Sequence, residues 1–202
     1  MLRVTVLAAI APRFEASYSR VAETFPQVTL VRETDFAKQL EASVAASGEF
    51  LLFGVDDALF CDRVPLGPAI AALREHALLS CVHLKLSPGL SFSHPANAVQ
   101  QQPRLETLGD ELAAFRGGDG SHDWNYPFEL CGTLYRAPLV RAVLALLAEG
   151  GAAAHPNRLE VAGNAVWAHA LGAAAQGERR ACLQRRAMVP PRAPAERQRP
   201  GG

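Results

Sequence analysis

The sequence predicts an α/β fold: one domain with a mostly parallel central sheet flanked by helices. Three observations support this prediction. Short apolar runs alternate with segments of helical spacing, a pattern typical of strand and helix repeats. The run at residues 50–55 is apolar at five of six positions without polar alternation, as in a strand buried on both faces. The 202 residues are 49% hydrophobic, enough for one sizeable core.

The first half of the chain alternates strands and helices. Apolar runs predict strands at residues 2–8, 28–31, 50–55 and 78–86. Helical spacing predicts helices at residues 13–25, 36–46 and 66–75. Thr34 or Asp35 provides an N-cap for the second helix, and Pro68 lies in the first turn of the third. Strands separated by helices in this way favour parallel pairing.

The middle of the chain is less regular. Residues 87–102 and 116–121 contain prolines, glycines and polar residues and are predicted to be loops. Between them, residues 105–115 are expected either to be helical or to lie over the site. Long loops in a compact domain tend to be lids or binding loops; the alternative is a variable surface insertion.

The remaining elements complete the alternation. Residues 130–136 are predicted to be a strand, and Pro138 opens a strongly apolar core helix. Asn157 and Glu160 have the spacing of a capping box at the start of the last helix, which extends to Gly172. A helix N-terminus also suits an anion or hydroxyl, so Glu160 is a candidate site residue. Residues 181–189 are expected to form a final edge strand.

Two adjacent carboxylates, Asp56 and Asp57, follow the apolar run at residues 50–55. The carboxyl ends of strands in open α/β sheets face the ligand crevice, so a metal or phosphate site is expected there. Adjacent aspartates repel each other, and a cation would relieve that repulsion. The alternative is a solvated turn in which one aspartate caps the next helix.

Aromatic and polar residues are concentrated between positions 122 and 129. Trp124 and Tyr126 could stack on sugar rings, and Asp123 and Glu129 could accept hydrogen bonds from hydroxyl groups. The competing interpretation is a buried aromatic plug.

Charge and cysteine content exclude several classes of protein. Cys61, Cys81, Cys131 and Cys182 are widely spaced, which favours reduced thiols over a zinc site or disulfides. Seven arginines against two glutamates follow Gly177, and residues 190–202 are predicted to be a disordered basic tail. No aromatic residues are interleaved with these arginines, so a nucleic-acid partner is not expected. Weak contact of the basic tail with an anionic membrane surface is expected instead. No signal peptide or transmembrane segment is predicted, so a cytoplasmic location follows.

Several of these segments resemble bacterial GT-A-type glycosyltransferases (family 2-like). The resemblance covers residues 4–189 and rests on five motifs in order: Phe-Gly-Val-Asp-Asp-Ala-Leu-Phe at 53–60, Cys-Val-His-Leu-Lys-Leu at 81–86, Asp-Trp-Asn-Tyr-Pro-Phe at 123–128, Gly-Thr-Leu-Tyr-Arg at 132–136 and Pro-Asn-Arg-Leu-Glu at 156–160. It implies a GT-A-like (Rossmann-like) domain over residues 1–189 that takes a sugar from a nucleotide-sugar donor to a glycan or other acceptor.

The resemblance also implies roles for individual residues. Asp56 and Asp57 would hold Mn²⁺ or Mg²⁺, which neutralises the diphosphate leaving group. Glu129 or Asp123 would deprotonate the acceptor or stabilise charge on the sugar. The other implied site residues are the donor-binding Lys85 and the sugar- or acceptor-binding Trp124, Tyr126 and Glu160.

The chain also departs from that family. Ala58 replaces a third acidic residue, Cys131 replaces an aspartate before the glycine, and the chain begins at what resembles the family's second strand, without the first β-α unit. An alternative function is therefore a catalytically weak or inactive relative that binds nucleotide-sugar or glycan or acts as an interaction protein. A phosphorylation-receiver domain fits less well, because no earlier strand supplies its second carboxylate.

Overall fold

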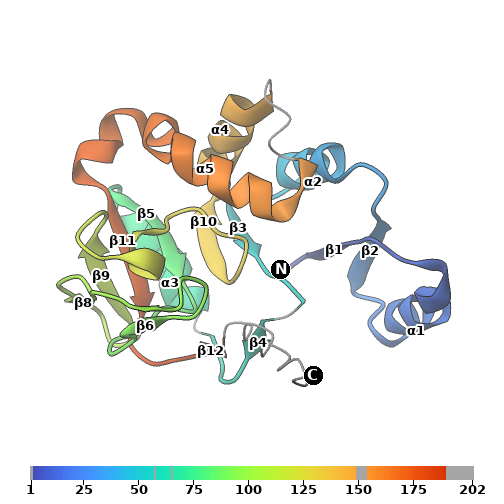
Figure 1. The fold of residues 1–202 in the computed structure, drawn as a ribbon, viewed down its shortest axis with the longest axis horizontal. Helices are drawn as coiled ribbons and strands as arrows, with labels where there is room; N and C mark the ends of the chain where they lie inside the picture. Colours follow the sequence, from blue (N-terminus) through green and yellow to red (C-terminus); the bar gives the residue numbers. More distant parts are fainter. Residues whose placement is uncertain (1, 57, 65, 149–153, 190–202) are drawn as a thin grey trace, which may run out of the picture.

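The protein has a mixed α/β fold built on a six-stranded sheet; the computed structural model describes residues 2–56, 58–64, 66–148 and 154–189 (Figure 1). The strand order is β3 (Phe50–Phe53), β10 (Thr133–Arg136), β5 (Leu79–His83), β11 (Arg179–Leu183), β9 (Leu112–Arg116) and β8 (Glu106–Leu108). Of the five neighbouring pairs described in this sheet, only β5 and β11 are parallel. However, β3, β5, β11 and β8 all run in one direction, opposite to β10 and β9.

Helices cover both faces of this sheet. One face packs against α2 (Phe36–Ala45), α4 (Ala137–Leu147) and α5 (Pro156–Leu171), which lie together at the top of Figure 1. Cys81 and Tyr135 point toward these helices. The opposite face packs against α3 (Leu66–Glu75), where Val82 and Leu134 are buried. Alternate residues of β5 and β10 therefore enter two separate cores, as strand geometry requires.

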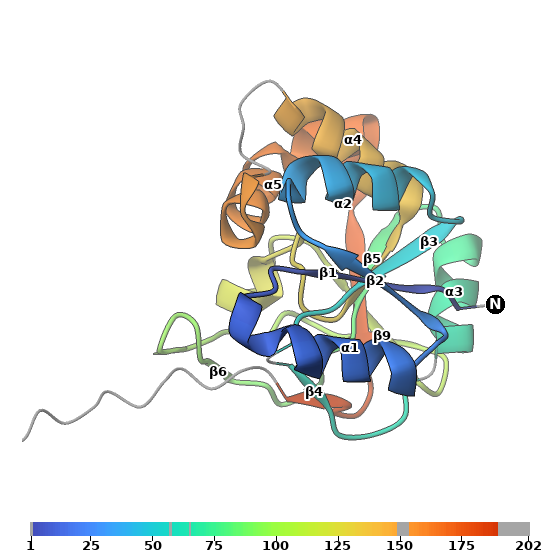
Figure 2. The same cartoon turned by 90° about the vertical axis from the view of Figure 1, so that its right-hand side faces the viewer.

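The N-terminal part is a separate two-stranded unit. Here β1 (Val4–Ala8) pairs in parallel with β2 (Val28–Arg32), and a short 3₁₀ helix, η1 (Pro12–Phe14), leads into α1 (Glu15–Thr24). Figure 2 shows α1 on one side of this small sheet and α2 on the other. No residue of α1 is buried.

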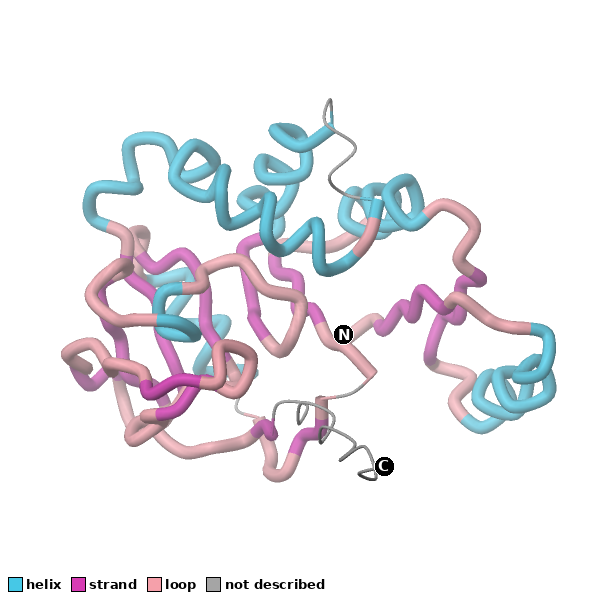
Figure 3. The backbone as a smooth tube through the Cα atoms, viewed as in Figure 1, coloured by secondary structure: helices cyan, strands magenta, loops and turns pink. Residues whose placement is uncertain are grey.

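Short elements complete the described chain, as the backbone trace shows (Figure 3). Two small antiparallel pairs join β6 (Phe92–Ser93) to β7 (Ala98–Val99) and β4 (Leu59–Phe60) to β12 (Met188–Val189). The 3₁₀ helices η2 (His122–Asn125) and η5 (Gly172–Gly177) precede β10 and β11. None of the described helices is long and apolar enough to cross a membrane.

The structure confirms the predicted fold class of a central sheet flanked by helices. It also confirms the strands near residues 2–8, 28–31, 50–55 and 78–86, the three helices between them and the Asp35 cap, whose carboxylate accepts a hydrogen bond from the Lys38 amide. Residues 190–202, the predicted disordered tail, lie outside the described residues.

Other predictions were wrong in their details. Residues 105–115 are neither a helix nor a cover over the site, because β8 and β9 form a hairpin at one end of the central sheet. Residues 181–189 are not an edge strand: β11 lies between β5 and β9. The N-cap of α5 is His155 rather than Asn157, since Nδ1 of His155 accepts the hydrogen bond from the Asn157 amide. The strand at residues 50–53 is only half-buried, because β3 is an edge strand.

Candidate functional site

The site lies where strands β3 and β5 end and β10 begins. Thr133, the first residue of β10, is opposite both Phe53 and His83, the last residues of β3 and β5. Strands β3 and β5 run in the same direction, so their carboxyl ends lie at the same edge of the sheet. A ligand site is expected at such an edge. Lys85 follows His83 by two residues, and Glu129 comes from the segment that precedes β10.

A buried ion pair between Lys85 and Glu129 forms the centre of this cluster. Nζ of Lys85 contacts Oε2 of Glu129, whose side chain is 2% exposed, whereas that of Lys85 is 12% exposed. Burial alone would raise the pKa of Glu129, but the Lys85 ammonium and His83 outweigh it and hold the pKa below its usual range. Burial opposes the charge on Lys85, yet Glu129 raises the pKa of Lys85 above its ordinary value. Both groups are therefore ionised at neutral pH.

His83 supports Glu129 from inside the protein. Its Nδ1 lies 3.3 Å from Oε1 of Glu129 and 3.0 Å from Oγ1 of Thr133. Its Nε2 lies 3.4 Å from Sγ of Cys81. Burial would lower the pKa of His83, but Cys81 and Glu129 raise it to about 9. Glu129 thus has a cationic neighbour on each side.

Three further ionisable side chains surround Lys85. The carboxylate of Asp123 and, when it is ionised, the sulfur of Cys131 help to raise the pKa of Lys85. Asp123 is half-buried, and its Oδ1 accepts a hydrogen bond of 2.8 Å from Ser93 Oγ. Tyr126 is also half-buried; burial and the carboxylates of Glu160 and Glu129 raise its pKa. The cluster therefore combines one ammonium, several carboxylates and a phenol at the sheet edge.

Helix α5 fixes the backbone of the segment that carries Glu129. Oε1 of Glu160 accepts a 2.6 Å hydrogen bond from the Leu130 amide, and burial raises the pKa of this carboxyl. Asn164, one turn later, donates to the Phe128 carbonyl and accepts from the Phe128 amide at 2.6 and 3.1 Å. Glu160 therefore holds the main chain, and the predicted capping box does not explain it.

The predicted sugar-stacking role of Trp124 does not agree with its burial. The Trp124 side chain is completely buried, its ring lies edge-on to Phe115 at 5.3 Å, and its Nε1 donates to the Leu90 carbonyl. Such an indole has no exposed face on which a sugar ring could stack. For Trp124 the structure shows the aromatic plug that was the competing interpretation, whereas Tyr126 keeps a partly exposed ring.

Of the two predicted metal ligands, the structure describes Asp56 alone. Asp56 is exposed and follows the end of β3, and Asp57 lies outside the described residues. Within the described ranges, no group of three or more His, Cys, Asp or Glu side chains could hold a metal ion. The carboxylate of Asp56 is the type of oxygen ligand that Mn²⁺ and Mg²⁺ prefer. The donor chemistry therefore fits a hard divalent cation, and the assignment remains a prediction.

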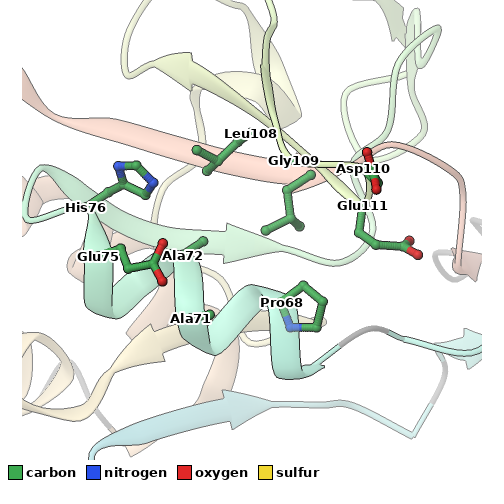
Figure 4. Close-up of a pocket in the computed structure, with 10 residues that line it drawn as sticks. Pro68, Ala71, Ala72, Glu75, His76, Leu108, Gly109, Asp110 and Glu111 are labelled. Atoms are coloured by element: carbon green, nitrogen blue, oxygen red, sulfur yellow. The ribbon is translucent and has the colours of Figure 1, made fainter.

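Two cavities in the described part of the chain lie away from this cluster. One, of about 320 Å³, opens between α3 and the β8–β9 turn and is lined by Pro68, Ala72, Glu75, His76, Asp110 and Glu111 among others (Figure 4). The other, of about 260 Å³, lies between α2 and α4. Neither is lined by a sequence-predicted site residue.

Sequence reasoning brought together five of the clustered residues but missed three. Lys85, Asp123, Tyr126, Glu129 and Glu160 were predicted and lie together. His83, Thr133 and Asn164 were not predicted. The alternation of Cys81, His83 and Lys85 in an apolar strand was the available signal, because alternate residues share one face.

No protein-family model matches the chain. The chain is similar to the bifunctional glycosyltransferase pgtA of Dictyostelium discoideum, with 30% identity over 166 residues. The match covers 75% of this chain and 22% of that protein, so the chain spans about a fifth of the length of the curated relative. The chain is therefore similar to part of a glycosyltransferase.

Proposed function

We propose that this chain is a glycosyltransferase domain that moves a sugar from a nucleotide-sugar donor to a glycan or other acceptor. The observation that supports this most is the grouping of Lys85, Glu129, Asp123 and Tyr126 at the carboxyl edge of β5. The relationship to a glycosyltransferase supplies the reaction class. Location in a bacterial cytoplasm remains a prediction.

Lys85 is the donor-binding residue of this proposal. Its side chain is 12% exposed, and its ammonium contacts the buried carboxylate of Glu129. Departure of a nucleoside diphosphate leaves negative charge on the phosphate oxygens, and a fixed cation stabilises that charge. Mn²⁺ or Mg²⁺ on Asp56 and Asp57 would supply further positive charge to the same leaving group.

The carboxylates of Asp123 and Glu129 have different roles in this proposal. Asp123 is half-buried and therefore accessible to an acceptor hydroxyl, whose proton it would take as general base. Glu129 is buried between two cations and stays ionised, so it keeps Lys85 in place and adds negative potential beneath the sugar. Tyr126 would contribute a half-exposed ring and a hydroxyl for orienting sugar.

Isothermal titration of the chain with uridine and guanosine diphosphates, with and without Mn²⁺, tests this proposal. We expect metal-dependent binding that is lost in Asp57→Asn and weakened about tenfold in Lys85→Met, the loss of one charge-assisted contact. Lys38→Met is a matched control, because Lys38 is the chain's other lysine and lies exposed at the start of α2.

Donor turnover separates the enzyme from a binding protein. Release of nucleoside diphosphate from a nucleotide-sugar, abolished in Asp123→Asn, would support transfer. Binding without turnover in any acceptor mixture would instead support the inactive relative suggested by Ala58 and Cys131. A folded chain that binds neither diphosphate would contradict the proposal.

A further inference from the structure

His83 is a polar side chain in the middle of an apolar core. It is completely buried on the face of β5 that packs toward α4 and α5, and the Phe115 ring of β9 stacks beside it at 6.4 Å. A buried imidazole without hydrogen-bond partners would destabilise the fold, so the contacts of His83 matter. Its polar contacts are the side chains of Cys81, Glu129 and Thr133.

These contacts have one geometric consequence for Glu129. Thr133 Oγ1 donates a hydrogen bond to Oε1 of Glu129 at 2.7 Å. His83 Nδ1 lies within hydrogen-bond distance of the same Glu129 Oε1 and of Thr133 Oγ1. The Oε1 atom is thereby held on the side of the core. Among the described residues, the second oxygen, Oε2, has the Lys85 ammonium as its polar neighbour.

We propose that His83 is a positioning residue: through Nδ1 it orients the Glu129 carboxylate, which in turn holds Lys85 at the rim of the site. This inference rests on the proposed role of Lys85 in binding the donor diphosphate. His83 itself is buried and does not touch the donor. Its effect on the reaction passes through two side chains, in the order His83, Glu129, Lys85.

Two substitutions separate this role from mere filling of the core. The side-chain nitrogen of asparagine occupies the place of Nδ1, so His83→Asn keeps a donor toward Glu129. Glutamine reaches the place of Nε2, so His83→Gln keeps the contact toward Cys81 and loses the one toward Glu129. Both variants remove the ring and the charge. Cys81→Ala is the matched control, because Cys81 is the neighbouring buried partner on the Nε2 side.

The first readout is binding of uridine and guanosine diphosphates with Mn²⁺. We expect His83→Gln to weaken binding about tenfold and to leave the unfolding midpoint close to that of His83→Asn, with His83→Asn restoring most of the affinity. Cys81→Ala should bind as the unmodified chain does. Equal losses in the asparagine and glutamine variants, in proportion to lost stability, would overturn the inference.

The second readout does not depend on donor binding. The chain contains only two lysines, so NMR of lysine labelled at Cε reports Lys85 and Lys38 separately. A fixed Lys85 gives two distinct Hε resonances, which merge when the side chain rotates freely. We expect distinct resonances in the unmodified chain and in His83→Asn, and merged ones in His83→Gln.

The two readouts keep the two proposals apart. If no diphosphate binds, the proposed function fails, and the Lys85 resonances still decide whether His83 positions Glu129. If the resonances remain distinct in His83→Gln, the positioning inference fails even where donor binding is confirmed.

Discussion

At the scale of single residues, the charge balance beneath Lys85 links the site to the stability of the fold. The pKa of His83 is raised to about 9 in the folded chain, against an ordinary value of 6.5. A group with a raised folded pKa stabilises the fold fully below its unfolded value, and that contribution is lost as pH rises through the folded value. We therefore expect the melting temperature to fall by several degrees between pH 6.5 and 9.5.

The alkaline loss is measured by differential scanning fluorimetry against His83→Asn, which has no titrating imidazole. Ionisation of groups that do not neighbour His83 contributes equally to both proteins and cancels in the difference. A parallel pH dependence of the two melting temperatures would show that His83 is not charged in the folded state.

A second buried ion pair, between Glu178 and Arg180, is structural. The Glu178 carboxylate accepts hydrogen bonds from Arg180 Nε, Ser80 Oγ and Trp167 Nε1 at 2.7–2.9 Å. Glu178→Ala leaves Arg180 buried without its partner and should destabilise the fold by about 3–5 kcal/mol in urea denaturation. The exposed pair of Glu106 with Arg179 is the control: Glu106→Ala should cost less than about 1 kcal/mol. Similar losses in both variants would contradict this assignment.

Sequence reasoning identified charged site residues better than their supports. Asp123 and Glu129 were identified in a short segment rich in aromatic and polar residues, and Lys85 through the resemblance to glycosyltransferases. Arg180 was grouped with a basic C-terminal segment, yet it is buried in β11. Its partner Glu178 is only two residues away, but the sequence does not show that both side chains turn inward.

At the scale of elements, α5 and the Glu129 segment fit together through Gly163. A Cβ atom on Gly163 would lie 2.2 Å from Cδ1 of Phe128, and Asn164 fixes the backbone of Phe128. We expect Gly163→Ala to destabilise the fold by about 1–3 kcal/mol, because the ring cannot move without disturbing the site segment.

Gly48→Ala provides the opposite result in the same measurement. Gly48 is exposed between α2 and β3 and has open space around it, so alanine should stabilise by up to about 1 kcal/mol because it restricts the unfolded chain. Stabilisation by Gly163→Ala would show that α5 and Phe128 are not in close contact.

Local sequence signals predicted the bounds of helix α3 better than the position of strand β11 in the sheet. Residues 66–75 were predicted with the bounds that the structure shows, because Pro68 and apolar spacing are local features. The start of α5 was misassigned, since a histidine N-cap is unusual and an Asn-x-x-Glu spacing was present nearby. Glu160 serves the Leu130 amide, a contact with a partner 30 residues away that no local pattern encodes.

At the scale of the whole molecule, strand order was the part that the sequence could not supply. β10 enters antiparallel between β3 and β5, and β11 enters beside β5 from near the other end of the described chain. Alternation of strands and helices predicts direction along successive units, and four of the six strands do share one direction. Which strands become neighbours depends on long-range pairing.

The N-terminal unit and the central sheet should differ in stability. The described part of β1 pairs only with β2, no residue of α1 is buried, and Phe14, Val21 and Phe25 are all more than 40% exposed. By contrast, β5 is buried at every position between two paired strands. Because amides exchange with solvent through local opening, we expect the amides of β1, α1 and β2 to exchange at least about tenfold faster than those of β5, β10 and β11.

Helix α2 is the internal control for this hydrogen-exchange measurement. It follows β2 directly, but Leu40 and Val44 pack into the core beside α4, so its amides should be protected. Equal protection of α1 and α2 would mean that the exposed apolar face of α1 is covered in solution.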